Sequence, residues 1–165
     1  MAFALRAEGL WKLYESGESV IHAVQDVSLS INQGSMVAIM GPSGCGKTTL
    51  LNVLSGIDEP NSGTVIINGE NLYGSSDDER TRVRGKHMGF IFQEFNLLPV
   101  MTALENVELP LLIQGTPANE ARKEATKALT AVGLGDRLEH RPAELSGGQQ
   151  QRVAIARAVV HRPTI

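Results

Sequence analysis

The chain has 165 residues, of which 42% are hydrophobic and 20% charged, and this composition excludes disordered, collagen-like and coiled-coil proteins. Fifteen Lys and Arg against eighteen Asp and Glu give a net charge of -3, so a broad basic surface for nucleic acid is excluded and any phosphate must be held locally. One cysteine, Cys45, excludes an internal disulfide. No apolar run approaches the ~20 residues of a spanning helix, so we expect a cytoplasmic chain without a transmembrane segment.

The first half of the chain predicts strands that flank a glycine-rich loop and a helix. Residues 27–31 alternate apolar and polar, as in a half-buried strand, and residues 37–40 are a continuous apolar run typical of a buried strand. Six residues rich in glycine follow, and residues 47–55 then have helical spacing, ending at Gly56. Asn68-Gly69, after the apolar residues 65–67, predicts a hairpin. We therefore expect a small antiparallel patch beside a parallel sheet.

The second half predicts mainly helices. Residues 77–86 begin with acids and end with bases, which suits a solvent-facing helix better than a binding patch. Residues 88–92 predict another buried strand. Thr102 and Glu105 form a capping box, the first sign of a helical stretch over about residues 100–145. This stretch interrupts the α/β pattern and looks like an inserted subdomain.

The glycine-rich loop carries the first chemical motif. Residues 41–48 read Gly-Pro-Ser-Gly-Cys-Gly-Lys-Thr, which satisfies G-x-x-x-x-G-K-[ST] between a predicted strand and a helix. Glycines let backbone N–H groups turn towards a phosphate, Lys47 would reach the β- and γ-phosphates, and the Thr48 hydroxyl would bind Mg2+. A chemically silent glycine turn is the alternative, and the flanking elements argue against it. The predicted phosphate-binding residues are Gly41, Pro42, Ser43, Gly44, Cys45, Gly46, Lys47, Thr48 and Thr49.

A second glycine motif begins a helix near the end of the chain. Residues 145–152 read Leu-Ser-Gly-Gly-Gln-Gln-Gln-Arg, in which Ser146 and Gln149 form a capping box. An ordinary capped helix is the simpler interpretation, but Gly147 and Gly148 would each cost about 1 kcal/mol in such a helix. We therefore expect another group to approach this backbone closely, as at a second anion site.

Together the two motifs resemble those of ABC ATPases, in which residues 41–49 correspond to the Walker A loop and residues 145–152 to the signature motif. The resemblance covers essentially the whole chain, and residues 92–111 are similar to the segment after the Q-loop in the subfamily for lipoprotein release and macrolide export. It implies an α/β P-loop NTPase core with a small antiparallel β subdomain and an inserted α-helical subdomain. Residues 1–165 would form one partial domain, with an ATP-binding core and β subdomain at 1–95, a helical subdomain at 96–145, and the signature motif and helix at 146–165.

The resemblance also implies roles for individual residues towards ATP and Mg2+. Gln93 would be the Q-loop glutamine, close to Mg2+ and the attacking water, and with Lys47 it forms the predicted catalytic pair; alternatively, Gln93 is only a polar strand end. Tyr14 would stack on adenine, although an aromatic residue there can equally serve packing. The signature residues would cover the ATP of a second subunit in a head-to-tail dimer; they are Ser146, Gly147, Gly148 and Gln149.

The implied function is that of an ATP-binding and ATP-hydrolysing subunit of an ABC membrane transporter for export or lipoprotein release. It would lie peripherally at the cytoplasmic face of the membrane and dock on an integral membrane permease through the apolar residues 95–101, without nucleic acid. A P-loop kinase is an alternative that the signature motif argues against. An ABC ATPase of a non-transport membrane complex, for cell division or signalling, remains open.

The family pattern continues beyond residue 165 with an apolar strand ending in Asp-Glu. We therefore expect an N-terminal fragment that is truncated before this strand, lacks the catalytic Glu and does not hydrolyse ATP on its own. The sheet would be incomplete, with unpaired backbone groups and uncovered apolar side chains along residues 37–40, a condition that invites aggregation.

Overall fold

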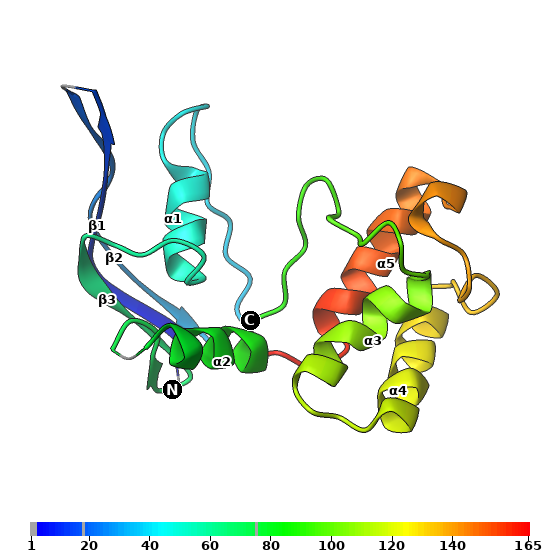
Figure 1. Cartoon of the computed structure of the whole chain (residues 1–165). Coiled ribbons are helices and arrows are strands. Elements are labelled where there is room, and N and C mark those ends of the chain that lie inside the picture. The colour runs from blue at the N-terminus through cyan, green and yellow to red at the C-terminus, as the bar shows by residue number, and fades with distance from the viewer. Residues whose placement is uncertain (1–2, 18, 75) are drawn as a thin grey trace. The chain divides into compact units, whose positions relative to one another are not determined.

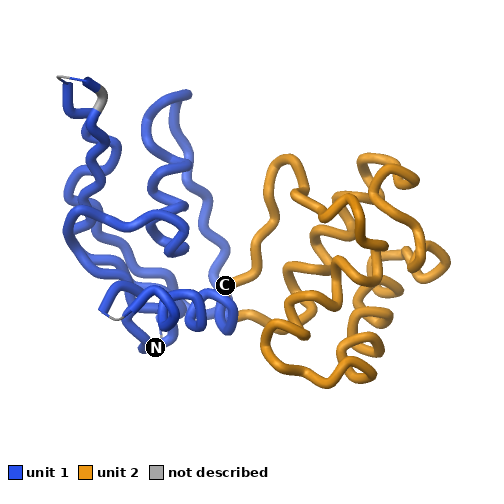
Figure 2. The backbone as a smooth tube through the Cα atoms, in the orientation of Figure 1, with its two compact units in different colours: residues 1–87, 164 blue, residues 88–163, 165 orange. Residues whose placement is uncertain are grey.

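A computed structural model describes residues 3–17, 19–74 and 76–165. The chain forms two compact units, coloured separately in Figure 2: unit 1 comprises residues 1–87 and 164, and unit 2 comprises residues 88–163 and 165. Within the described ranges, none of the helices is both long enough and apolar enough to cross a bilayer.

Unit 1 is built on an antiparallel sheet with the strand order β2-β1-β3-β4 (Figure 1). The predicted hairpin is confirmed, because Asn68 and Gly69 join β3 to β4 with φ angles of 48° and 85°. Two successive positive φ angles are the requirement of a type I′ turn. The predicted strand at residues 27–31 is confirmed as part of β2. The strands are β1 (Phe3–Ser16), β2 (Ser19–Asn32), β3 (Ser62–Ile67) and β4 (Glu70–Asn71).

Two helices complete unit 1. Helix α1 (Lys47–Leu54) packs against β1 and β2, and Gly56 follows its end with a φ angle of 72°, as predicted. Helix α2 (Asp77–His87) is acidic in its first turn and basic in its last, also as predicted. Apolar side chains of the strands and of both helices are buried and form the core of unit 1. This core contains Leu5, Ala7, Leu10, Val24, Val53, Leu54, Val65, Ile67, Leu72 and Val83.

Two predicted strands were wrong. Residues 37–40 and 88–92 have no strand pairing within the described part of the chain, where all paired strands are antiparallel. The reason is physical: an apolar run reports hydrophobicity, whereas a strand also needs a neighbour that takes its backbone hydrogen bonds. The uncovered apolar edge expected near the phosphate loop is confirmed, since Val37 is 57% and Met40 87% exposed.

Unit 2 is helical, with three helices that pack against one another (Figure 1). Both predicted capping boxes are present, one from Thr102 at α3 and one from Ser146 at α5. Pro110 lies inside α3, which continues beyond it to Ile113. The core combines Leu104, Val107, Leu129, Leu134 and Val153, all almost fully buried. The elements are α3 (Ala103–Ile113), α4 (Ala118–Ala131), the short 3-10 helix η1 (Pro142–Glu144) and α5 (Gly147–Val159).

Candidate functional site: a phosphate loop in unit 1

The loop that precedes α1 has a backbone that only glycine fits at its last turn. Gly46 is the N-cap of α1, with a φ angle of 86°, and a Cβ atom there would collide with the Ala23 carbonyl of β2. Gly44 has a φ angle of 79°, another left-handed position. No side chain caps α1, so the N–H groups of its first turn are available to an anion, and the helix dipole favours negative charge there.

Lys47 lies over this loop. Its Nζ donates hydrogen bonds to the carbonyl oxygens of Gly41 at 2.9 Å and Pro42 at 2.6 Å, and it lies 3.6 Å from the Cys45 Sγ. These contacts hold one positive charge at the mouth of the loop, beside the free N–H groups of α1. The next residue, Thr48, is exposed in the first helical turn. The loop therefore presents a cation, a hydroxyl and backbone donors together, which is the donor set that a nucleotide polyphosphate requires.

An open cavity of about 830 Å³ adjoins the loop, a volume within the range of small-molecule and cofactor sites. One part of its wall is polar and is formed by residues 43–49; the rest is mainly apolar and comes from the strands and from the segment before the loop. The apolar wall includes Tyr14, Ile21, Val24, Ile39 and Met40. The phosphates of a nucleotide would thus contact the polar wall of the cavity, and its aromatic base would contact the apolar wall.

Tyr14 is held by two charged neighbours. Its hydroxyl donates a 2.6 Å hydrogen bond to Asp58 Oδ2, and the Lys12 Nζ lies 5.0 Å from the centre of its ring. Lys12 also pairs with Asp58 Oδ1 at 2.7 Å. The hydrogen bond to Asp58, with burial, raises the pKa of Tyr14. Burial acts to raise the pKa of Asp58, but the hydrogen bonds from Lys12 and Tyr14 outweigh it and hold that pKa below its ordinary value.

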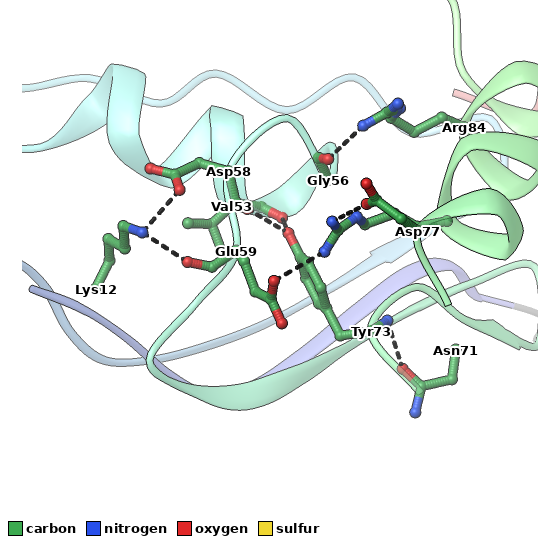
Figure 3. A network of polar contacts seen from close by, with 10 residues as sticks. Lys12, Val53, Gly56, Asp58, Glu59, Asn71, Tyr73, Asp77 and Arg84 are labelled. Carbon is green, nitrogen blue, oxygen red and sulfur yellow. Dashed lines mark hydrogen bonds and ion pairs between the residues drawn. The ribbon is translucent and has the colours of Figure 1, made fainter. Parts of the chain in front are cut away.

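The segment that carries Asp58 is fixed by the network in Figure 3. The Tyr73 hydroxyl lies 2.5 Å from the Val53 carbonyl oxygen and 2.7 Å from that of Asp58, and Arg84 donates to the Gly56 carbonyl. Burial raises the pKa of Tyr73, which keeps it a donor. The sequence motifs pointed to none of these residues, because their contacts join positions far apart in the chain.

Gln93 lies in unit 2, exposed in a turn. The residues that follow it, Phe95 and Asn96, have φ angles of 61° and 46°, a left-handed conformation that side chains disfavour. Arg157 of α5 donates to both of their carbonyl oxygens, at 2.7 and 2.6 Å, and burial lowers its pKa. A charged side chain from the helix of the second glycine motif therefore holds the turn next to Gln93.

The apolar segment beyond Gln93 is shaped by one buried amide. Asn106 is fully buried, and its Oδ1 accepts from the Leu98 N–H at 2.8 Å. Its Nδ2 donates to the carbonyl oxygens of Leu98, Met101 and Thr102. The loop keeps apolar side chains at the surface, with Val100 76% exposed.

The second glycine motif begins α5 in unit 2. Ser146 Oγ accepts from the Gln149 N–H, and Gln149 Oε1 accepts from the Ser146 N–H at 2.8 Å. A Cβ atom on Gly147 or Gly148 would meet nothing within 4 Å, and neither has a positive φ angle. Packing within the described chain therefore does not require these two glycines, and the bare backbone suits a group from outside it.

No group of three or more His, Cys, Asp or Glu side chains among the described residues could hold a metal ion. A cation in the cavity would therefore need ligands of another kind, such as the Thr48 hydroxyl and oxygens of a bound polyphosphate.

Comparisons with known proteins agree with this architecture. A family model described as ABC transporter matches residues 24–165. An uncharacterized ABC transporter ATP-binding protein of Thermotoga maritima is 51% identical over 154 residues, which are 93% of this chain and 66% of that protein. The lipoprotein-releasing system ATP-binding protein LolD of Pseudomonas fluorescens is 50% identical over 96% of this chain and 70% of its own length. The macrolide export ATP-binding/permease protein MacB 1 of Yersinia pestis is 47% identical over 98% of this chain.

Solved structures match as well. The dimeric ATP-binding cassette MJ0796 bound to ADP and Pi superimposes with a TM-score of 0.87 and 44% identity, over 96% of this chain and 70% of that one. The predicted fold class, with its incomplete sheet, is confirmed by this match, as is the resemblance on which it was based. The chain spans about two thirds of the Thermotoga maritima protein and 25% of the Yersinia pestis protein.

Proposed function

The chain belongs to the ABC transporter family, and from this premise we propose that it is the ATP-binding part of a transporter subunit for export or lipoprotein release. The observation that carries the proposal is the phosphate loop of unit 1: a left-handed glycine turn, an uncapped helix start and the Lys47 ammonium over the loop. We treat residues 1–165 as one partial domain of such a subunit. Its relatives LolD and MacB 1 are named for lipoprotein release and macrolide export.

Within this proposal the cavity binds ATP with Mg2+. The loop N–H groups and Lys47 bind the phosphates, the Thr48 hydroxyl is a ligand of Mg2+, and the ring of Tyr14 stacks on adenine. Bound Mg2+ supplies charge neutralisation on the phosphates. Gln93 serves Mg2+ and the attacking water in the complete subunit.

The partners are a second ATPase subunit and a membrane permease. The open backbone at Gly147 and Gly148 supports an approach by the nucleotide of a second subunit in a head-to-tail dimer, with Ser146 and Gln149 beside it. The surface-exposed Leu98 and Val100 support docking of an apolar helix from a permease. The subunit would then lie at the cytoplasmic face of the membrane.

Hydrolysis is a separate step. Family membership supports ATPase activity in the complete subunit, whereas the 165 residues contain no Asp-Glu pair after an apolar strand that could activate water. We propose that this polypeptide alone binds ATP and releases phosphate negligibly. Phosphate release near one per second by the isolated polypeptide would contradict that part.

The binding proposal is tested by titrating the chain, fused to a soluble carrier, with a fluorescent ATP analogue and Mg2+. Lys47→Ala removes the loop cation and should weaken binding at least about tenfold, as expected for a charge-assisted contact. Lys127→Ala is the matched control, because Lys127 is an exposed lysine of α4 paired with Glu124. Equal affinities for the parent and both variants would refute the proposal.

A further inference from the structure

We propose that Asp58 is the positioning residue that fixes the Tyr14 ring for stacking on a nucleotide base, and that it thereby controls how much the base contributes to affinity. This inference rests on the proposed function, because it assumes that the cavity of unit 1 binds a nucleotide. Asp58 is not among the residues that line the cavity, and it acts through Tyr14.

Tyr14 lies where its own strand provides little support. Strand β1 pairs with β3 only as far as Trp11, which lies opposite Ser62, so the end of β1 with Tyr14 pairs, among the described strands, with β2 alone. The pairing with β2 is also irregular on both sides of Lys12. Such irregularities twist a strand and redirect its side chains. The sheet ladder alone therefore does not define the orientation of the ring.

Beside the end of β1, where β3 no longer pairs, the segment 58–61 takes the place of a second neighbouring strand. The Asn61 side chain accepts from the Leu13 N–H at 2.7 Å, and the Asn61 N–H donates to the Trp11 carbonyl at 2.8 Å. Lys12 Nζ donates to the Glu59 carbonyl at 2.7 Å. These contacts bind the irregular part of β1 to one short segment, and the segment is in turn fixed by Tyr73 and its neighbours (Figure 3).

The two carboxylate oxygens of Asp58 accept hydrogen bonds from different donors. Oδ2 accepts from the Tyr14 hydroxyl at 2.6 Å and Oδ1 accepts from Lys12 Nζ at 2.7 Å. The same ammonium lies over one face of the Tyr14 ring, and in this proposal a base stacks on the other face. Tyr14 is thus fixed at its hydroxyl and on one face of its ring; the residue is 39% exposed and lines the cavity.

This arrangement makes a prediction that separates the base from the phosphates. Loss of the hydroxyl contact frees the ring and should weaken binding of ATP, whereas tripolyphosphate needs only the loop and Lys47. A general role of Asp58 in folding of unit 1 would instead weaken both ligands together.

The test measures competition of MgATP and of magnesium tripolyphosphate against the fluorescent analogue, on the carrier fusion of the full 165 residues. Asp58→Asn keeps the size of the side chain but has one acceptor oxygen for two donors, and Tyr14→Phe removes the donor. We expect each to weaken MgATP about 3- to 10-fold, the range of one lost hydrogen bond. Binding of tripolyphosphate should stay within twofold, and the double variant should be no weaker than Tyr14→Phe.

Glu59→Gln is the matched control, because this neighbouring carboxylate pairs with Arg80 at 3.2 Å and does not line the cavity. It should leave both affinities unchanged. Equal weakening of MgATP and tripolyphosphate by Asp58→Asn would overturn the inference, as would unchanged MgATP affinity or additive losses in the double variant. Failure of the proposed function is distinct: the unaltered chain would then bind neither ligand, and the inference would fall with it.

Discussion

The buried amide of Asn106 gives a quantitative prediction for unit 2. Asn106→Leu keeps a similar volume but removes all four hydrogen bonds of the side chain. The Leu98 carbonyl also accepts from Met101 N–H, and the Thr102 carbonyl from the Asn106 backbone. The Leu98 N–H and the Met101 carbonyl are held by the amide itself, and they would lose this partner.

One orphaned buried donor costs about 1–3 kcal/mol, and the remaining lost bonds add about 1 kcal/mol. Extra burial of a leucine in place of an amide offsets part of this loss, so the free energy of unfolding should fall by about 2–3 kcal/mol. With a urea slope of about 1–3 kcal/mol per molar, the midpoint should fall by about 0.7–3 M.

The assay is a urea titration of the carrier fusion, with the carrier signal subtracted, followed by circular dichroism at the helical minimum. Trp11, the one tryptophan of the chain, lies in unit 1 and provides a second probe away from the substitution. Asn119→Leu, at an exposed position of α4, should stay within about 0.5 kcal/mol. A midpoint for Asn106→Leu within 0.3 M of the parent would refute the reasoning, as would a shift confined to the Trp11 signal.

Three further predictions concern unit 1. Cys45 is exposed in the phosphate loop, so a maleimide should label it and MgATP should slow the labelling; equal rates with and without MgATP would contradict this. Hydrogen bonds from Lys86, His87 and Arg82 lower the pKa of Glu70 from 4.5 to about 2, so its contribution to stability is present above pH 4.5 and lost as the pH falls towards 2. Stability of the Glu70→Gln variant, followed by thermal unfolding, should fall less between pH 5 and pH 2 than that of the parent, and parallel curves would refute the assignment. Replacement of the exposed apolar residues Val37 and Met40 by Thr and Gln should reduce self-association in light scattering, and unchanged scattering would show that this edge does not cause self-association.

The correct sequence predictions share one property: each signal lies within a few consecutive residues. The Asn68-Gly69 turn, the capping boxes of Thr102 and Ser146, and the glycine loop before Lys47 encode their conformation locally through φ angles and side-chain-to-backbone hydrogen bonds. Such signals do not depend on the rest of the fold, so they can be recognised in a single sequence.

The failures share the opposite property. Residues 37–40 were predicted as a strand from their hydrophobicity, although pairing depends on a partner elsewhere in the chain. The Asp58 carboxylate meets Tyr14 across a separation of 44 positions, and no periodic pattern marks such a contact. No local sequence signal marks Asn106 as buried, yet in unit 2 its side chain is fully buried. Long-range pairing and the burial of single polar groups are therefore the parts that the sequence alone did not reveal.

The difference in pairing along β1 affects how often its two parts open, and not only how their side chains are oriented. From Leu5 to Trp11 the strand pairs with β2 on one side and β3 on the other, whereas beyond Trp11 its described residues pair with β2 and are otherwise held by contacts with the segment 58–61. We expect amide protons in the first part to exchange with solvent only when the sheet opens, and those of the last residues to exchange when the contacts with the segment 58–61 open, at a lower free energy. A base stacked on Tyr14, as proposed above, would therefore dissociate when this end of the strand opens, while the core of unit 1 stays closed.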